Sequence, residues 1–543
     1  MSDSSDTLYL REDVYFEPLI NGWYAWPYLL PPVTGARHMV HTHRRIMNSF
    51  VKNHKLHMMA VKQPGMAGSE YLDCNEDQLP AIRAMVDTID NDHADLVELS
   101  DAVRQLDEIL REHTSGESVE PLYERVPEPL KGYVELTMDL EHRPSYRLIE
   151  GLLYRSRYYK PKLQNLLFGR LDAKGDRPFV MSTPRLPAGD NLQLEADYND
   201  PLIDALFRAR IEPVSPAEVD ALFADRPTRG GLDYRVLFTT QAPQRKHQAV
   251  AEGVRVQYLG HAGFLIETAE VSILIDPVIA SRGEAFADDV ISFSELPPRL
   301  DYICITHHHQ DHANLETLLQ LRYKTGKVLV PRNNGGTLVD PSLRLLLRQF
   351  GFDAVEMDDM EELSVPGGRI VSIPFLGEHG DLNVRTKAAW FIELCGKRIL
   401  LAADSSNLEP RMYRHIADQL GALDIMAIGM ECVGAPYTWL YGALHTKLVS
   451  RKIKESRRLN GSGYEQAARI ADMLQPSRIF LYALGLEPWY KYFMGIEYDE
   501  HSAQLVETGR MLEACEGRGI PAERLYGKKT VHLCSLTEHG ATE

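Results

Sequence analysis

The chain is 543 residues long, with 44% hydrophobic residues, 25% charged residues and a formal net charge of −18. This length predicts two to four domains with ample cores, and the composition is that of an ordinary globular protein. The excess of acidic residues argues against a nucleic-acid binder, which needs a basic face.

The cysteines and the apolar runs narrow the class of protein further. The six cysteines have no Cys-x-x-Cys spacing, so neither a zinc ribbon nor a redox pair is indicated. No run reaches the ~20 apolar residues needed to span a bilayer, and the acidic N-terminus lacks the apolar core of a signal peptide. We expect a reduced, cytoplasmic protein.

A mixed α/β N-terminal domain is expected over residues 1–245. Aromatic residues and prolines crowd residues 23–32, which is typical of an irregular packed segment. Apolar residues recur at helical spacing over 96–110, so a helix is predicted there, and others are predicted near 148–158 and 217–223.

This first half contains no metal triad, phosphate loop or nucleophile motif. Three histidines close together lack a carboxylate partner in the sequence, so we interpret them as structural. These histidines are His38, His41 and His43.

The apolar periodicity weakens between residues 225 and 253, which places a domain boundary at 245/246, to within about ten residues. From 246 to 543, short β-branched strands alternate with helical patterns, which favours an α/β sandwich. Strands are expected at 254–259, 263–266, 271–275, 302–305, 328–330, 399–401, 425–428 and 479–482 and near Ile370 and Ala389, and helices at 315–321, 342–350 and 464–474.

The most informative stretch follows the apolar run 302–305. Here His307-x-His309-x-Asp311-His312 crowds imidazoles and a carboxylate into six positions. Such groups are costly to bury unless they are paired or bound to metal. His307 and His309 can face the same ion, while Asp311 and His312 can turn to a second ion roughly 3.5–4 Å away.

More candidate ligands follow other predicted strands, at the carboxyl ends where functional groups gather in α/β folds. Asp276 is placed to hold a ligand histidine from behind. Glu378 and His379 follow one strand, and Asp404, whose two oxygens could bridge two ions, follows another. Glu431 follows a third.

The His-x-His-x-Asp-His run, followed by Glu378-His379 and Asp404, resembles the metallo-β-lactamase superfamily, whose αββα fold binds two metals at this edge. The resemblance covers about residues 250–540. Two departures are evident: a glutamate stands at 378, where a hydrolase usually supplies histidine, and no histidine follows the strand at 479–482. Oxygen-rich ligation suits iron or manganese better than zinc.

With the segment from Glu17 to Tyr28, the arrangement is similar to the diiron β-hydroxylases of the chloramphenicol-biosynthesis type. The resemblance implies an O2-dependent non-heme diiron monooxygenase that β-hydroxylates an aromatic amino acid tethered as a thioester to a carrier domain. That carrier belongs to a nonribosomal peptide synthetase of antibiotic or natural-product biosynthesis. A homodimer formed through the first domain is also implied.

The same resemblance implies a ligand set and cofactors. His307, His309 and Glu378 would hold one iron, and Asp404 would lie between the two irons. The other iron would be held by Asp311 and His312. The irons are oxo- or hydroxo-bridged when oxidised, O2 is the co-substrate, and a reductase acts as the external electron donor.

Three residues keep more than one interpretation. Glu378 is expected to be catalytic as well as a ligand, and Glu431 is a second catalytic candidate that could gate the cluster, hold substrate or cap a helix. His379 is a ligand in a dizinc interpretation and a supporting group in the diiron one. His261 either lines the site or is structural.

The segment from Lys447 to Arg458 is basic, although the chain as a whole is acidic: it contains six cationic residues and one acidic residue, Glu455. It is either a docking surface for an acidic carrier domain and the phosphate of its arm, or a solvated face. The neighbouring Tyr437, Trp439 and Tyr441 form either a wall for an amino-acid side chain or part of a core.

Two rival functions share these motifs. The first is a dizinc hydrolase of a lactone or phosphodiester, with a metal-bridged hydroxide as nucleophile. Glu378 and the missing last histidine count against it. The second is a non-catalytic member of the superfamily, and the number of ligands present counts against that.

Overall fold

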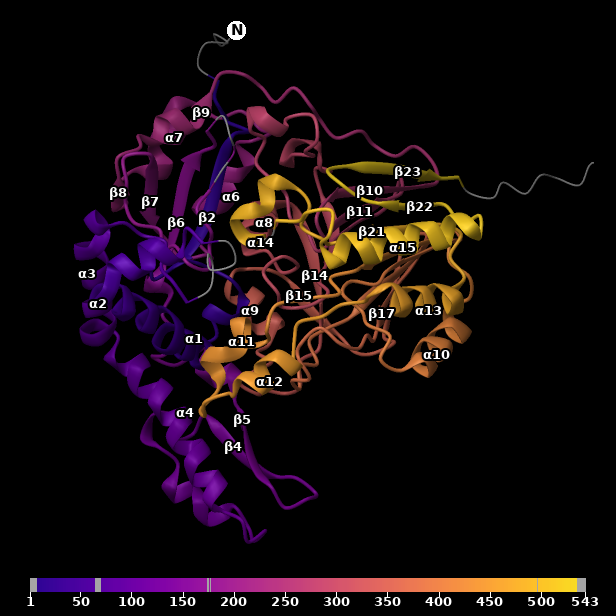
Figure 1. Cartoon of the computed structure of the whole chain (residues 1–543). Coiled ribbons are helices and arrows are strands. Elements are labelled where there is room, and N and C mark those ends of the chain that lie inside the picture. Colours follow the sequence, from indigo (N-terminus) through magenta and orange to yellow (C-terminus); the bar gives the residue numbers. More distant parts are fainter. Residues whose placement is uncertain (1–6, 64–69, 173–174, 176, 496, 535–543) are drawn as a thin grey trace, which may run out of the picture.

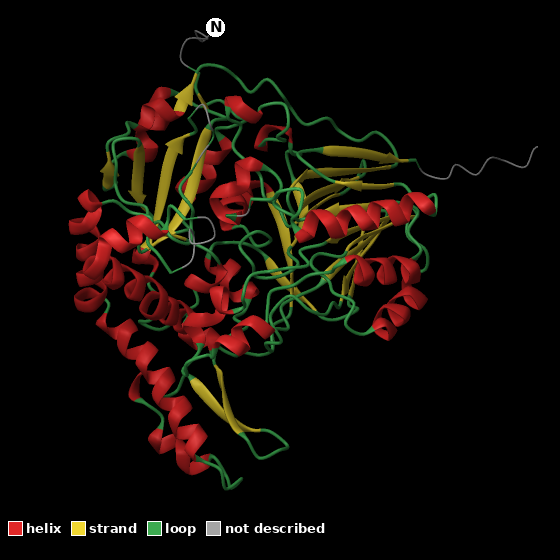
Figure 2. Cartoon of the chain, viewed as in Figure 1, coloured by secondary structure: helices red, strands yellow, loops and turns green. Residues whose placement is uncertain are grey.

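The structure is a computed structural model of the chain, and it describes residues 7–63, 70–172, 175, 177–495 and 497–534. Two regions pack side by side (Figure 1): an N-terminal region of helices and a sheet, and a C-terminal pair of sheets flanked by helices. Figure 2 shows how the strands of the second region stack between helices.

The C-terminal region contains two seven-stranded sheets. The first has the order β15-β14-β13-β12-β11-β10-β23, with β12 to β15 parallel. Its strands are β10 (Val254–Gly260), β11 (Gly263–Glu267), β12 (Ser272–Ile275), β13 (Leu300–Cys304), β14 (Thr325–Pro331), β15 (Ala354–Met357) and β23 (Lys529–Leu533).

The second sheet has the order β16-β17-β18-β19-β20-β21-β22, with β19 to β22 parallel. Its inner face packs on the first sheet through a buried apolar core that includes Phe264, Ile273 and Trp390. The strands are β16 (Glu362–Val365), β17 (Gly368–Ile373), β18 (Ala389–Leu394), β19 (Lys397–Leu401), β20 (Ile425–Gly429), β21 (Ile479–Tyr482) and β22 (Ala522–Arg524).

Helices cover both outer faces, which completes an αββα sandwich. The second sheet is covered by α10 (Pro410–Leu420), α13 (Tyr464–Leu474) and α15 (Ala503–Gly517), and the first by α8 (Leu315–Leu321) and α9 (Leu343–Gln349). Three short helices lie near the loops at one edge (Figure 1): α11 (Thr438–Tyr441), α12 (Arg451–Ser456) and α14 (Lys491–Met494).

The N-terminal region is built on a five-stranded antiparallel sheet of order β3-β2-β6-β7-β8. A hairpin of β4 (Val134–Met138) and β5 (Pro144–Leu148) extends away from the body beside α4 (Figure 1). The other elements are β1 (Tyr9–Leu10), β2 (Val14–Ile20), β3 (Trp23–Tyr24), α1 (Pro32–His38), α2 (Arg45–Ala60), α3 (Leu79–Asp92), α4 (Ala94–Glu112), α5 (Glu150–Leu153), β6 (Gln164–Arg170), β7 (Asn191–Glu195), α6 (Pro201–Arg208), α7 (Pro216–Phe223), β8 (Thr228–Gly230) and β9 (Phe238–Thr239).

The two regions share one hydrophobic core. Phe16 and Phe168 of the N-terminal sheet belong to the same buried cluster as Leu318 and Leu319 of α8 and Ile303 of β13. All seven residues of α8 are buried, since the helix lies between the two regions. The helix that follows the histidine run is therefore fixed by the N-terminal region as well as by its own sheet.

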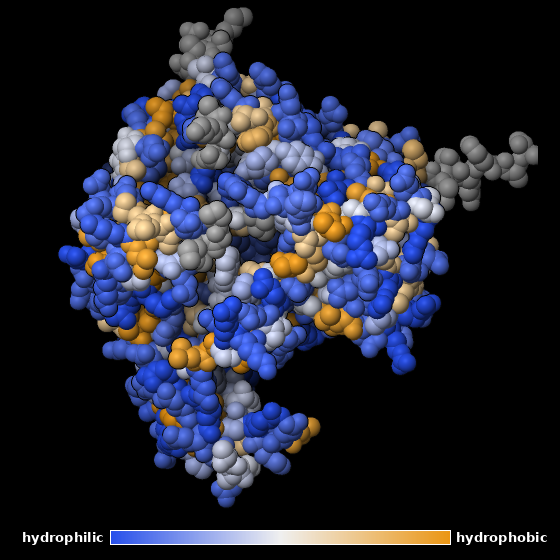
Figure 3. Space-filling model, viewed as in Figure 1, coloured by the Kyte–Doolittle hydropathy of each residue, from blue (hydrophilic) through white to orange (hydrophobic). Residues whose placement is uncertain are grey.

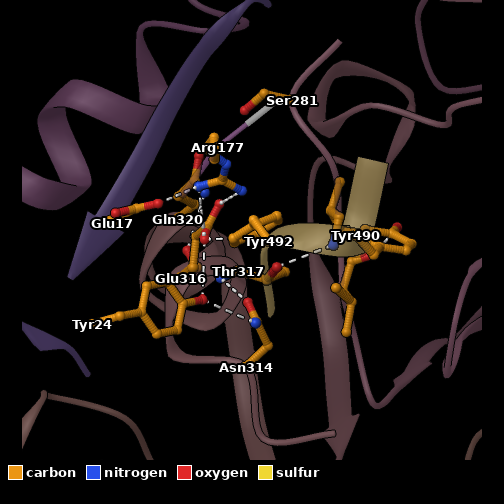
Figure 4. A network of polar contacts seen from close by, with 12 residues as sticks. Glu17, Tyr24, Arg177, Ser281, Asn314, Glu316, Thr317, Gln320, Tyr490 and Tyr492 are labelled. Carbon is orange, nitrogen blue, oxygen red and sulfur yellow. Dashed lines mark hydrogen bonds and ion pairs between the residues drawn. The ribbon is translucent and has the colours of Figure 1, made fainter. Parts of the chain in front are cut away.

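A buried polar network crosses the same junction (Figure 4). Arg177 lies 3.1 Å from Oε1 of Glu17 in β2 and 3.0 Å from Oε1 of Glu316 in α8. Its guanidinium also stacks on the ring of Tyr492 in α14, at 3.3 Å from the ring centre. Tyr24 and Tyr492 donate hydrogen bonds to Oε2 of Glu316, at 3.0 and 2.9 Å.

The structure confirms the predicted fold class and revises one local prediction. The segment 23–32 is packed and largely irregular, as expected: it holds only the short β3, a 3-10 turn at Pro27–Leu29 and the first residue of α1, and its aromatic side chains are buried. The helix predicted over 148–158 is reduced to α5, because Leu148 is the last residue of β5. The helices predicted over 96–110 and 217–223 are present as α4 and α7.

The three N-terminal histidines lie where α1 ends and a π-helical turn, Met39–Arg44, begins. His43 stacks on Trp23, with the ring centres 4.2 Å apart, and His38 packs edge-on against Trp26. None of the three belongs to a potential metal-binding group among the described residues. Within those same residues, no helix combines the length and the apolar character required to cross a bilayer.

Candidate metal centre

The histidine run occupies the loop between β13 and α8, and Asp276 holds that loop from behind. One carboxylate oxygen of Asp276 accepts a hydrogen bond from the backbone N–H of Thr306 at 2.7 Å, and the other accepts from Thr306 Oγ1 at 2.6 Å. The second oxygen also lies 2.8 Å from Nδ1 of His312. This predicted contact is present, and it leaves Nε2 of His312 facing the other candidate ligands.

A first group of potential ligands comprises His307, His309 and Glu378, whose donor atoms all lie within 4.8 Å of one another. Nδ1 of His309 lies 3.1 Å from Nε2 of His307 and 2.7 Å from Oε1 of Glu378. Glu378 follows β17 with a φ of +72°, a left-handed backbone that costs a non-glycine residue energy. The fold thus holds this glutamate toward the histidines at the expense of local strain.

A second group comprises His307, His312 and Asp404. Oδ2 of Asp404 lies 3.1 Å from Nε2 of His312 and 3.8 Å from Nε2 of His307. Asp404 follows β19 and Ala403, whose φ of +49° again turns the chain sharply at a strand end. One carboxylate is therefore placed between two histidines that come from the same run.

The third group comprises His261, Asp311 and His312. His261 stands at the end of β10 with a φ of +47°, and its Nε2 lies 3.0 Å from Oδ2 of Asp311. The same oxygen lies 3.6 Å from Nε2 of His312. From the sequence, His261 could be either a site residue or a structural one. In the structure it contacts Asp311, a candidate ligand.

The charge balance of these groups fits a metal centre. Three carboxylates converge: those of Glu378 and Asp404, with side chains 6% and 10% exposed, and that of Asp311, which is 22% exposed. Their ion-pair partners among the described residues are histidines alone. Nε2 of His312 and Oδ1 of Asp404 are buried without a hydrogen bond. Buried charge of this kind is costly unless a cation compensates it.

The pKa shifts follow from burial and from these neighbours. Burial and the adjacent His312 and His309 hold the pKa of His307 well below its usual value. Burial would also lower the pKa of His312, but the carboxylates of Asp311 and Asp404 overcome it and raise that pKa well above normal. Burial raises the pKa of Glu378, an effect partly offset by His309. Three imidazoles with three carboxylates form a ligand set richer in oxygen than zinc prefers.

Tyr441, from α11, connects two histidines beside the first group. Its hydroxyl lies 3.0 Å from Nε2 of His309 and 2.8 Å from Nδ1 of His379. Because Nδ1 of His309 faces Glu378, the contact with Tyr441 fixes which nitrogen of His309 is free to bind metal. His379 belongs to none of the three groups found among the described residues. No motif or spacing in the sequence marks Tyr441 for this role.

A cavity of about 380 Å³ opens over the cluster, with Asp311, Glu378 and Asp404 among its lining residues. The surface is hollowed between α14 and α11 (Figure 3), and both helices contribute to the lining. Most of the remaining wall is apolar. The apolar side chains are Phe179, Met181, Val433, Trp439, Leu440, Leu459, Phe493 and Met494.

Glu431 lies in the wall of this cavity and outside the three ligand groups found in the described part of the chain. It accepts hydrogen bonds from Tyr498 at 3.0 Å and from Gln504 at 2.5 Å. The hydroxyl of Tyr498 also lies 2.7 Å from the carbonyl oxygen of Leu484. Burial raises the pKa of Glu431 to about 7, so this carboxyl group is readily neutral.

Comparison with known proteins covers both regions. Residues 9–243 match the family model of the diiron non-heme β-hydroxylase N-terminal domain, and residues 272–482 match that of the β-lactamase superfamily domain. The chain is 37% identical over 531 residues to the 4-amino-L-phenylalanyl-[CmlP-peptidyl-carrier-protein] 3-hydroxylase of Streptomyces venezuelae, covering 96% of this chain and 99% of that protein.

Solved structures agree with this result. The crystal structure of CmlA, a diiron β-hydroxylase from Streptomyces venezuelae, superposes with a TM-score of 0.90 at 37% identity, covering 97% of this chain and 100% of that one. A metal-dependent hydrolase of Brucella ovis is 26% identical over 163 residues, but that match spans only 26% of this chain. The similarity to the hydroxylase thus extends through both regions, whereas the similarity to the hydrolase does not.

Proposed function

We propose, from the premise that the chain belongs to the family of diiron non-heme β-hydroxylases, that it hydroxylates the β-carbon of an aminoacyl group held as a thioester on a peptidyl carrier domain. Membership makes the chain an oxidoreductase and makes the dizinc hydrolase the less favoured alternative. The carrier is that of a nonribosomal peptide synthetase in natural-product biosynthesis. An aromatic aminoacyl group suits the apolar and aromatic lining of the cavity.

The observation that carries the proposal is the position of Glu378. Its carboxylate lies 2.7 Å from His309 at the floor of the cavity, at a position where hydrolases of this fold usually have histidine. Oxygen donors favour iron over zinc. A strained backbone at this residue is consistent with a functional placement rather than with packing.

The three groups indicate which residues would hold two irons. His307, His309 and Glu378 would hold one ion. Asp311 and His312 would hold the other, and Asp404 would lie between the two sets. Iron bound there supplies the one-electron chemistry with O2 that an unactivated C–H bond requires.

Other residues of the chain orient these ligands. Asp276 directs Nε2 of His312 into the cluster, and Tyr441 directs Nδ1 of His309. His261 fixes one oxygen of Asp311 and leaves the other free. Such supporting contacts determine ligand orientation and basicity.

The cavity would bind the aminoacyl side chain and exclude water from the reacting carbon. Phe179, Trp439 and Phe493 supply aromatic walls. Glu431, which is readily neutral, would contact the substrate, because its carboxyl group lies in the wall and outside the ligand groups. It acts on the substrate in this proposal and does not bind iron.

The electron balance requires a further partner. Insertion of one oxygen atom of O2 into a C–H bond, with release of the other as water, consumes two electrons and two protons. An external reductase would supply the electrons, with O2 as co-substrate. A cytoplasmic location belongs to the same proposal, because aminoacyl carrier thioesters are made there.

A homodimer formed through the N-terminal region is also part of the proposal. Exposed apolar side chains on this region, such as Leu56, Met59 and Leu140, support it. Light scattering after gel filtration would give twice the mass of the single chain. A mass equal to that of one chain at micromolar concentration would contradict the dimer.

The function is tested with anaerobically prepared, iron-loaded protein and a carrier domain bearing a panel of aminoacyl thioesters. In the presence of a chemical reductant and ¹⁸O2, mass spectrometry of the intact carrier is expected to show one added ¹⁸O atom on an aromatic substrate. The zinc-loaded protein serves as the control. Loss of the thioester without O2, or retention of activity with zinc, would contradict the proposal.

Glu378→His tests the residue that carries the argument. We expect this variant to bind zinc in preference to iron and to lose hydroxylation, while its fold is retained. Metal analysis after growth with both metals measures the preference. Unchanged hydroxylation in Glu378→His would remove the main argument for an oxygenase.

A further inference from the structure

The basic segment from Lys447 to Arg458 surrounds one side of the cavity mouth. Arg458 itself lines the cavity, together with Val433 and Trp439. Most of the remaining cations lie on α12 and on the loop before it, next to α11 (Figure 1). Arg457 directly follows α12 and lies 3.9 Å from Asp381. The only opposite charge within the segment is that of Glu455, which pairs with Arg451 at 2.6 Å.

Most of these cations lack a carboxylate partner. Among the described residues, none pairs with Lys447, Lys452 or Lys454. Arg458 uses only Nε, which donates to the carbonyl oxygen of Gly434 at 2.8 Å, and its two terminal nitrogens have no partner in the same described part of the chain. In a chain of net charge −18, a cluster of unpaired cations of this size indicates a binding surface for an anionic partner.

Exposed apolar side chains lie on the same surface. Leu448 is fully exposed, and Val433, Trp439 and Ile453 are between 43% and 48% exposed. Figure 3 shows apolar side chains among hydrophilic ones in this part of the molecule. Exposed apolar side chains among unpaired cations are typical of a protein interface rather than of a solvated helix face.

We infer that this surface, formed by residues 433–439 and 447–458, docks the carrier domain, and that Arg458 binds the phosphodiester of its phosphopantetheine arm. The inference depends on the proposed function. Lys447, Lys452 and Lys454 attract the acidic carrier domain, while Leu448 and Ile453 pack against it. The arm then passes Arg458 and Trp439 into the cavity and delivers the thioester to Glu378 and Asp404.

Two double variants with the same change of charge test the docking surface. Lys452→Glu/Lys454→Glu reverses two unpaired cations of α12, and Arg411→Glu/Arg414→Glu reverses two exposed cations of α10, on the far side of the second sheet. We expect the first to raise KM for the aminoacyl carrier domain by about tenfold or more with kcat unchanged, because charge reversal at a docking surface acts on association. Arg411→Glu/Arg414→Glu is expected to change neither KM nor kcat.

A small substrate separates docking from chemistry. The same aminoacyl group on free pantetheine lacks both the carrier domain and the phosphate, so both double variants should turn it over like the wild type. Arg458→Gln should raise KM for the carrier domain and for the 4′-phosphopantetheine thioester, but not for the pantetheine thioester. The KM of the wild type for the carrier should rise with salt, and that of Lys452→Glu/Lys454→Glu should rise less.

The outcomes distinguish the two proposals. If the wild type hydroxylates carrier-bound substrate and Lys452→Glu/Lys454→Glu has the KM of Arg411→Glu/Arg414→Glu, the docking surface is wrong and the proposed function stands. If Arg458→Gln raises KM equally for thioesters with and without the phosphate, its role as phosphate ligand is wrong. If the wild type hydroxylates neither substrate, the proposed function fails and the docking surface fails with it.

Discussion

Two buried polar regions of this molecule satisfy their charge in opposite ways. At the domain junction, Glu17 and Glu316 are matched by the guanidinium groups of Arg177 and Arg185, at distances between 2.5 and 3.1 Å. The candidate metal centre gathers three carboxylates, two of them buried, whose ion-pair partners among the described residues are histidines.

The difference separates a structural network from a binding site. In the junction network every carboxylate is compensated by the chain itself, so its role is to hold the N-terminal region against α8 and α14. In the metal centre the chain leaves negative charge and unbonded donor atoms at one point, and a cation from outside completes it. The following predictions test this contrast, from the largest expected effect to the smallest.

Arg177→Met should break the junction network. It leaves the buried carboxylate of Glu316 without its cation, and removal of one partner of a buried pair costs about 3–5 kcal/mol. Urea denaturation measures the free energy of unfolding. The control, Arg104→Met, removes an exposed pair with Glu108 and should cost less than about 1 kcal/mol. Equal losses for the two variants would show that the junction carries no special stability.

Asp404→Asn should have opposite effects on the two forms of the protein. Without metal, it removes uncompensated buried charge, so the melting temperature of the apoprotein should rise or stay unchanged. With metal, it removes a carboxylate proposed to hold iron, and iron affinity and hydroxylation should fall by about 100-fold or more. Calorimetry of both forms and iron titration are the measurements.

The control for Asp404→Asn is Asp340→Asn. The carboxylate of Asp340 is buried nearby but accepts hydrogen bonds from the backbone N–H groups of Asn334, Arg385 and Thr386. This variant should lose stability and keep its iron affinity. A destabilised apoprotein in Asp404→Asn would contradict the view that the centre lacks a cation.

Tyr441→Phe should weaken the centre without disturbing its packing. The ring still contacts Tyr28, whereas the hydroxyl that orients His309 is lost. Iron affinity should fall by about 10-fold, as for other supporting contacts of metal ligands, with the melting temperature of the apoprotein unchanged. Tyr437→Phe, one helical turn earlier, removes a hydroxyl that makes no hydrogen bond within the described residues and should behave like the wild type. Equal iron affinity in both variants would exclude the orienting role.

Glu431→Gln should change how stability depends on pH. Burial raises the pKa of Glu431 from 4.5 to about 7, so the folded protein holds this proton more tightly than the unfolded chain does. Stability from this group is therefore full below about pH 4.5, falls as pH rises through about 7, and stays lower above. The glutamine mimics the neutral acid, so the variant should gain about 3 kcal/mol at pH 8.5 relative to pH 5. Thermal unfolding of the variant and the wild type at the two pH values is the measurement. If the difference in stability between the two proteins is the same at both pH values, the pKa of Glu431 is not raised.

Part of this site could be predicted from local pattern. The His-x-His-x-Asp-His run lies at the end of a buried strand, and its spacing alone brings its side chains together. Glu378 and Asp404 were found by the rule that functional groups follow the carboxyl ends of strands. The same rule could have placed His261 in the site, since it follows β10 directly, but a single histidine carries too little signal to decide.

Other parts could not be found in this way. Tyr441 lies 132 positions from His309, and nothing in its neighbourhood of tyrosine and tryptophan distinguishes a wall, a core or an orienting hydroxyl. The helix predicted over 148–158 is shortened to α5, because the hairpin of β4 and β5 ends at Leu148. Domain limits, the ligand roles of single residues and the dimer stay predictions.

The sequence by itself indicated an α/β sandwich and the candidate ligands, because periodicity and strand-end position are local properties. The αββα arrangement and the family followed from the resemblance that the motifs carry. Only the tertiary structure decided which carboxylates keep a cation of their own. Arg177 reaches Glu316 across 139 positions, whereas Asp311, Glu378 and Asp404 meet only histidines. Charge compensation depends on which distant side chains the packed core brings within a few ångströms, and no local pattern encodes that distance.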